Sequence, residues 1–216
     1  MNDKKITKKL EKINKMIQEN NIAFKTATKA QKRVMIAQDV LAQIKAKRYV
    51  ADSGTWVDPT FSGKWNHDAP NDNASVQQMF ASKEIESCSV CALGSMFMSC
   101  TNLNNHTTFA QFNCESDDIG SMIDREDGGF SNGLDRFFTK NQLTLIEIYF
   151  EKGDGYFSIE NDTVDTNSRF YKSIDFNHVY AFYDECDSDQ ERLTAIMKNI
   201  IKNDGTFVPE KLKVMY

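Results

Sequence analysis

The sequence predicts a mainly α protein, a compact single helical domain around a buried central helix. Three observations predict it. The 216 residues include only three prolines and ten glycines, a composition that favours helices over a turn-rich β architecture. Residues 87–101 are apolar on every side, as in a helix enclosed by other elements. Capping-box patterns at Thr28 and Ser188 precede two amphipathic stretches. A chain of this length is long enough for one substantial core.

The N-terminal segment differs from the rest in charge and in pattern. Residues 1–48 carry 13 Lys and Arg against 4 Asp and Glu, a net charge of +9, whereas residues 49–216 carry 13 against 27, a net charge of −14. An apolar seam repeats at intervals of four, three and four residues, with lysines around it: Ile6, Leu10, Ile13 and Ile17, flanked by Lys5 and Lys9. About two heptads are too short for a free coiled coil. We therefore expect residues 1–25 to be a basic amphipathic helical arm on a domain spanning 26–216.

Helices are expected along most of that domain. Thr28 and Gln31 start one that runs to Arg48, with an apolar face of Val34, Ala37, Leu41 and Ile44. An irregular loop over 49–75, which holds Trp56 and Trp65, is expected to follow. Shorter helices are expected near 117–123, 131–138 and 141–150.

The C-terminal half contains the clearest helix pattern. Ser188 and Glu191 form a capping box that begins a helix over 188–203. Residues 178–185 fit a strand or a short buried helix, and we prefer the helix because no partner strand is evident. The central helix is expected over 88–100. We expect six side chains from these elements to share one core: Val90, Leu93, Phe97, Leu193, Ile196 and Ile200.

Five cysteines, an odd number with three of them in one presumed helix, suggest free thiols in a reducing compartment. We interpret them as buried packing residues, and two alternatives stay open. One is a cysteine hydrolase with Cys91 or Cys88 as nucleophile, His178 as base and Asp184 or Asp175 as the group that orients it. It would need His178 on a strand beside the central helix. The other is a zinc site, although the spacing is unlike common zinc fingers; its ligands would come from Cys88, Cys91, Cys100, His106 and Cys114.

Other motifs are weak. An EF-hand-like register has Gly128 at position five and Asp at position twelve, which disfavours calcium; its matching residues are Asp124, Glu126, Gly129 and Asp135. No P-loop, dinucleotide glycine fingerprint or serine elbow occurs, and we expect no cofactor. The sequence has no apolar run long enough for a transmembrane span and no signal-peptide pattern, so we expect a cytoplasmic protein.

Three pieces of the chain resemble a known pattern: residues 33–41 with the following Gly54-Thr-Trp, the run Cys88-x-x-Cys-Ala-Leu-Gly-Ser95, and residues 191–201 with 203–209. They resemble an uncharacterised family of small bacterial and phage proteins with a Cys-Ala-Leu-Gly-(Ala/Ser) core motif. The resemblance covers most of residues 30 to 210. It implies a compact helical domain of bacterial or phage origin, with the first 25 residues as an added arm, and it brings no activity.

The functional expectation follows from the arm. Residues 1–20 combine an apolar seam with six lysines and need a surface on which to dock. We expect a phage-type accessory or virion-associated protein that acts non-enzymatically, through a protein partner or self-association at this arm. Direct nucleic-acid binding is disfavoured because the arm lacks the arginine and aromatic residues that base contacts use. No membrane contact is expected.

Overall fold

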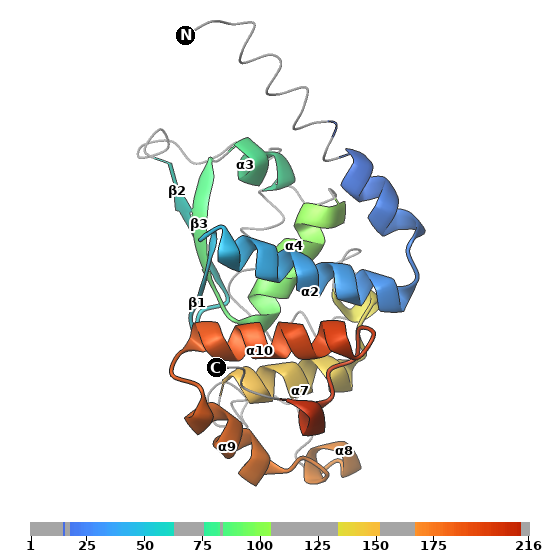
Figure 1. Cartoon of the computed structure of the whole chain (residues 1–216), viewed down its shortest axis with the longest axis vertical. Coiled ribbons are helices and arrows are strands. Elements are labelled where there is room, and N and C mark those ends of the chain that lie inside the picture. Colours follow the sequence, from blue (N-terminus) through green and yellow to red (C-terminus); the bar gives the residue numbers. More distant parts are fainter. Residues whose placement is uncertain are drawn as a thin grey trace, which may run out of the picture.

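The computed structural model describes residue 15 and residues 18–62, 76–82, 84–104, 134–151 and 167–212. Within these ranges a small sheet lies at one side of a group of packed helices (Figure 1). The protein is therefore mainly α, as predicted, but the domain is not wholly helical, because it includes a three-stranded sheet that the sequence analysis did not predict. No helix in the described part of the chain is long and apolar enough to cross a membrane.

The sheet has three strands in the order β1-β3-β2. β1 (Tyr49–Ala51) pairs parallel with β3 (Ile85–Val90), and β2 (Val57–Phe61) pairs antiparallel with β3. The prediction of an irregular loop from residue 49 is thus wrong over both β1 and β2. Each is short, and each pairs with residues of β3 that lie 24 to 39 positions later in the chain, so no local pattern marks it as a strand. Residues 63–75, the rest of the predicted loop, lie outside the described residues.

The segment predicted as a helix over 88–100 divides between a strand and a helix. Cys88 lies in β3, and its backbone N–H donates to the carbonyl of Arg48 (2.8 Å). The N–H of Cys91 donates to the carbonyl of Thr55 (2.7 Å), and α4 (Ala92–Asn104) begins at the next residue. The predicted helix start is therefore wrong, because residues 88–90 are paired in the sheet as part of β3. α4 itself is enclosed: its residues from Ala92 to Thr101 are all buried.

Gly94 allows the β1–β2 connection to cross α4 closely. A Cβ atom built on Gly94 would lie 1.9 Å from the carbonyl oxygen of Trp56 and 3.0 Å from a Val57 methyl group. The Trp56 ring then packs against Phe97, with 5.7 Å between the ring centroids. This close crossing ties the sheet to α4, and Trp56 serves as a packing residue there.

α2 (Lys29–Lys45) starts at the predicted capping box. Gln31 N–H donates to Thr28 Oγ1 (3.2 Å), and Thr28 N–H donates to Gln31 Oε1 (2.9 Å). The helix ends three residues before the predicted Arg48. Of the predicted apolar face, Ala37 is buried, and Leu41 and Ile44 are half-buried and pack against the core. The other buried positions are Ile36, Val40 and Gln43, because α4 and α10 both pack on this helix.

α10 (Asp189–Lys202) confirms the predicted C-terminal helix. Ser188 Oγ accepts from Glu191 N–H (3.3 Å), while the Glu191 carboxylate accepts from the N–H of Asp187 (2.8 Å). α10 packs against α2 on one side and against α7 (Lys140–Phe150) on another, as Figure 1 shows. Thr139 caps α7, which starts one residue before the prediction.

The remaining elements are short. α3 is Val76–Ser82, α8 is Arg169–Lys172, and the 3₁₀ turns η1 and η3 are Leu134–Arg136 and Pro209–Lys211. Within the predicted helix 131–138, the described residues form only η1. Residues 178–185 lie in α9 (Phe176–Glu185), which confirms the preference for a helix there. The predicted helix 117–123 lies outside the described residues.

One core joins these elements. The six residues predicted to share a core all lie in it, each at most 2% exposed: Val90, Leu93, Phe97, Leu193, Ile196 and Ile200. Phe24, in the helical residues 18–26 that precede α2, is also buried there, edge-on to Phe137 with ring centroids 5.4 Å apart. The end of the predicted arm thus packs on the domain. The arm residues before position 15, and Ile17, lie outside the described residues.

Candidate functional site

The two proposed nucleophilic cysteines are buried. Cys88 is fully enclosed in β3, and Cys91 is 2% exposed at the junction with α4, where its Sγ accepts from Gly94 N–H (3.3 Å). Burial raises the pKa of the Cys88 thiol to about 12, and burial with the nearby Glu147 and Glu151 carboxylates raises the Cys91 pKa further still. The thiolate is the reactive form of cysteine. Both side chains therefore stay protonated near neutral pH, which favours packing over nucleophilic chemistry.

The structure does not bring His178 to Cys91. His178 lies on α9, and its Nδ1 is 2.8 Å from the hydroxyl oxygen of Tyr149 on α7. Glu147 and Glu151 are the carboxylates close enough to Cys91 to affect its pKa, and Tyr149 lies two positions from each of them. Side chains two positions apart point to nearly opposite sides of a helix. His178, which contacts Tyr149, therefore lies on the other side of α7 from Cys91. The strand that the cysteine-hydrolase hypothesis required at His178 is a helix.

The two acidic partners proposed for His178 have other positions. The Asp175 carboxylate accepts the backbone N–H of His178 (3.3 Å) and so caps α9. Asp184 is exposed near the other end of the same helix, six residues from His178. Neither arrangement reproduces a triad in which a carboxylate orients the imidazole.

The proposed zinc ligands lie partly within and partly outside the described residues. Cys88, Cys91 and Cys100 are free and buried, while His106 and Cys114 lie outside the described residues. Among the residues that the structure describes, no group of three or more His, Cys, Asp or Glu side chains could hold a metal ion. The EF-hand-like residues Asp124, Glu126 and Gly129 also lie outside them.

Two carboxylates at the C-terminal end of α7, the buried Glu147 and the half-buried Glu151 that follows the helix, were not predicted. Glu147 is 4% exposed, and its Oε2 atom has no hydrogen-bond partner. Burial, with the Glu151 carboxylate one turn away, raises the Glu147 pKa to about 8. Burial raises the pKa of Glu151 to about 7, although its carboxylate accepts from the N–H of Gly54 (3.0 Å). At neutral pH Glu147 is mostly protonated.

These carboxylates adjoin the β1–β2 connection. Ser53 N–H donates to Asp189 Oδ2 (2.6 Å), and Arg192 binds Asp189 Oδ1 (2.5 Å) and the carbonyl of Phe150 (3.1 Å). The Arg192 guanidinium also lies 3.8 Å from the centre of the Tyr183 ring. Apart from Glu147, whose Oε2 stays unpartnered, these polar side chains tie the connection to α7 and α10. The cluster therefore supports the fold.

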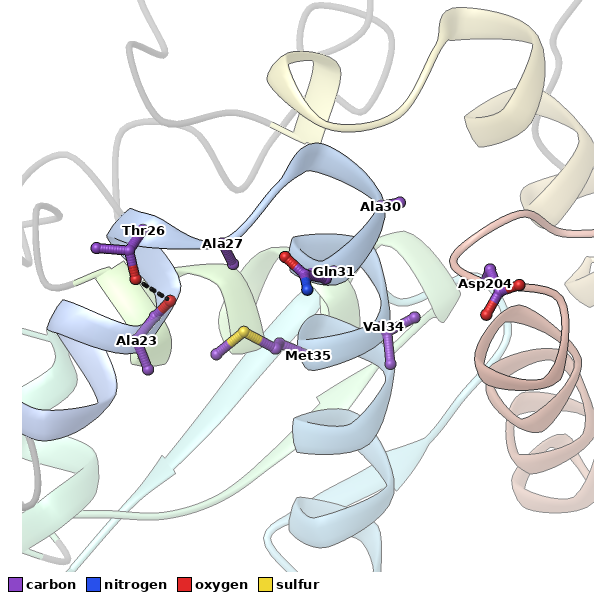
Figure 2. Close-up of a pocket in the computed structure, with 8 residues that line it drawn as sticks. All are labelled: Ala23, Thr26, Ala27, Ala30, Gln31, Val34, Met35 and Asp204. Carbon is purple, nitrogen blue, oxygen red and sulfur yellow. Dashed lines mark hydrogen bonds between the residues drawn. The ribbon is translucent and has the colours of Figure 1, made fainter.

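An open groove of about 600 Å³ lies where the helical residues 18–26 turn into α2. Figure 2 shows Ala23 and Thr26 on the first helical segment, Gln31, Val34 and Met35 on α2, and Asp204 beyond the end of α10. Ala27 and Ala30 complete the lining. Small and apolar side chains thus form most of the groove.

Two polar side chains of the groove, those of Thr26 and Gln31, have local partners, and the third, Asp204, is an exposed carboxylate. Thr26 Oγ1 donates to the carbonyl oxygen of Ile22 (3.0 Å), and Gln31 is held in the capping box with Thr28. The Ile22 side chain is 65% exposed, on the same helical face as Thr26 one turn later. This groove, with Ile22 beside it, is the candidate binding surface, and we call it the N-terminal groove.

The charges around the N-terminal groove are mixed, because the exposed carboxylate of Asp204 lines it. Residues 18–35 contain four Lys and Arg side chains and a single carboxylate, Glu19. Lys25 and Lys29 are exposed and form no ion pair with another described residue. Arg33 instead donates to the carbonyl oxygens of Gly205 (2.7 Å) and Phe137 (2.9 Å), which fixes the turn after α10 against α2.

Sequence reasoning missed the N-terminal groove. Alanines at 23, 27 and 30 are visible in the sequence, but nothing there shows that a turn folds them around a concavity. The partner-binding residues that the sequence did predict, Lys5, Ile6, Lys9, Leu10, Ile13 and Ile17, all lie outside the described residues.

Comparison of the chain with protein-family models, curated proteins and solved structures gave no match. The site must therefore be interpreted from its own geometry.

Proposed function

We propose that the protein is a non-enzymatic binding module that engages a protein partner through its N-terminal region. The observation that carries this proposal is the N-terminal groove, an apolar concavity beside the exposed Ile22. Exposed apolar side chains next to a groove are typical of protein interaction sites. The expected basic arm, residues 1–20, precedes the groove directly in the sequence, and we propose that it takes part in the same contact.

The chemistry of the described residues supports a binding role over catalysis. The thiols of Cys88 and Cys91 are buried and protonated, and His178 faces Tyr149 instead of a thiol. From the resemblance in the Cys-Ala-Leu-Gly-Ser run we further propose that the module is a phage-type accessory or virion-associated protein, working in the host cytoplasm or within a particle.

Site-specific photo-crosslinking tests the proposal. A photoreactive amino acid replaces Ile22 in one variant and Val50 in another, each made in the native host. Val50 is a matched control because it is also apolar and half-exposed, in β1, beyond the opposite end of α2. We expect one protein to crosslink from position 22 only. That protein, purified, should bind the full chain, and Ile22→Ser should weaken binding while Val50→Ser does not.

Two results would refute the binding module. One is a crosslinking pattern that is the same from both positions. The other is a purified partner whose affinity does not change with Ile22→Ser. Rapid labelling of Cys91 by an activity-based thiol probe, absent in Cys91→Ala, would instead restore the hydrolase hypothesis.

A further inference from the structure

We infer that residues 53–55 of the β1–β2 connection form a pH-sensitive latch, which stays closed while Glu147 is protonated and opens over Cys91 when Glu147 ionises. The latch concerns a different part of the molecule from the N-terminal groove, and it does not depend on the proposed binding function.

Side chains of neighbouring helices hold the latch in place. The N–H of Ser53 donates to Asp189 Oδ2 at the start of α10 (2.6 Å), and the N–H of Gly54 donates to Glu151 Oε2 at the end of α7 (3.0 Å). These bonds lie outside the sheet, because the latch falls between β1 and β2. Gly54 also has a φ of +81°, which glycine adopts readily. The latch can therefore part from both helices while the strands stay paired.

The closed latch covers Cys91. The N–H of Cys91 donates to the carbonyl oxygen of Thr55 (2.7 Å), and its side chain is only 2% exposed. Glu147 and Glu151 lie close enough to affect the same thiol, so Cys91 lies between the latch and α7. Cys100 is equally buried but lies nine residues further along the chain, within α4. An open latch should expose Cys91 and leave Cys100 covered.

The surroundings of Glu147 offer little to stabilise a negative charge. The side chain is 4% exposed, and its Oε2 atom has no hydrogen-bond partner. Glu151 lies one turn away and is a like charge when both residues are ionised. A buried charge without a partner is costly unless water reaches it. We expect the latch to admit that water, because two side-chain hydrogen bonds hold it instead of a helix or a sheet.

Neighbouring elements bring more negative than positive charge to this region. Asp52 precedes the latch, and α10 contributes Asp189 and Arg192. Arg192 is the cation that acts on these carboxylates among the described residues, and it is already bound to Asp189 and to the Phe150 carbonyl. The other titratable groups nearby have different contacts: Tyr183 of α9 lies against Arg192, His178 of α9 lies on the other side of α7, and Asp135 and Arg136 of η1 act on Cys100.

The direction of the pH effect follows from burial. Burial raises the pKa of Glu147 from 4.5 to about 8, and an open latch would return it toward the lower value. The closed state is therefore favoured at low pH, and its advantage is lost as the pH rises toward 8. The pKa of Glu151 is also raised, to about 7, but an ionised Glu151 accepts the N–H of Gly54 more strongly. Glu151 thus opposes opening, and Glu147 is the trigger.

Site-resolved alkylation of the full-length protein tests the latch. Short pulses of iodoacetamide at pH 6, 7 and 8, followed by peptide mapping, give separate rates for Cys91 and Cys100. At pH 8 we expect Cys91 to react about tenfold faster than Cys100, because the latch opens without unfolding of α4. Amide exchange should agree, with Gly54 less protected than Ile196 in α10.

A matched pair of variants identifies the trigger. The intrinsic reactivity of a thiol at a given pH cancels when the same cysteine is compared in two proteins. The Cys91 rate in the unmodified protein, divided by its rate in Glu147→Gln, should rise at least about tenfold from pH 6 to pH 8 and then level off. The same ratio against Glu185→Gln, at an exposed position on α9, should stay constant.

Two results would overturn the inference. Equal labelling rates for Cys91 and Cys100 would mean that Cys91 is exposed only by unfolding of the whole domain. A ratio between the unmodified protein and Glu147→Gln that is the same at pH 6 and pH 8 would mean that Glu147 does not control the opening.

Discussion

Replacing Glu147 by glutamine should stabilise the protein, and the gain should grow with pH. The carboxyl group of Glu147 has a pKa of about 8 in the folded protein against 4.5 when exposed. Between these values the unfolded chain releases the proton and the folded protein keeps it. Ionisation therefore favours unfolding, and the contribution of Glu147 to stability, fully present below pH 4.5, is lost as the pH rises through 8.

The size of the effect follows from the shift. A group whose pKa differs between the two states changes the free energy of unfolding by about 1.36 kcal/mol for each pH unit between them. Glu147 therefore costs up to about 3 kcal/mol at pH 7, and less where the structure relaxes around the charge. Glutamine has nearly the same shape as glutamate and cannot ionise. Because Glu147 Oε2 has no hydrogen-bond partner, the substitution breaks no hydrogen bond at that atom.

Urea unfolding at pH 5, 6, 7 and 8, at constant ionic strength, measures this directly. The unfolding free energy of the unmodified protein should fall across the series, with Glu151 contributing to the fall because its pKa is also raised, to about 7. The curve of Glu147→Gln should be flatter and should rise above it toward pH 8. Glu185→Gln, at an exposed position on α9, is the control. Parallel curves for Glu147→Gln and the unmodified protein would refute the reasoning.

Three further predictions concern the core and the thiols. Gly94→Ala should lower the unfolding free energy by about 1 to 3 kcal/mol or prevent folding, because its Cβ would meet the Trp56 carbonyl oxygen, which is backbone and cannot turn aside. Unchanged stability would contradict that contact. Phe24→Ala should lower the free energy of unfolding, measured in urea, by about 3 kcal/mol, because it removes a buried ring. Deletion of residues 1–14 should leave the urea midpoint unchanged within error. The reverse outcome would show that the arm, and not Phe24, stabilises the domain. Cys91 should react with iodoacetamide at neutral pH only when local or global unfolding exposes it, so its labelling rate should fall under conditions that stabilise the protein. A labelling rate that does not change with stability would contradict the burial of Cys91.

The sequence alone determined those helices whose capping residues lie next to them in the chain. The Thr28 and Ser188 caps each satisfy backbone N–H groups within four residues, so the information lies beside the helix it starts. The apolar period of α10 predicted the buried Leu193, Ile196 and Ile200 for the same reason. The buried state of the cysteine-bearing segment also followed from composition alone.

The tertiary structure decided the features that depend on contacts between residues far apart in the chain. Cys88 sits in a strand because Tyr49, which is 39 residues earlier, pairs with it, and no local pattern competes with a full ladder of backbone hydrogen bonds. Gly94 matters because Trp56 crosses it, and Glu147 is protonated because α7 turns it inward near Glu151 and Cys91. The N-terminal groove exists because a turn at Ala27 and Thr28 folds one helix beside another and Arg33 fixes a third wall. Burial, pairing and concavity are properties of arrangements in space, and only the folded chain brings their parts together.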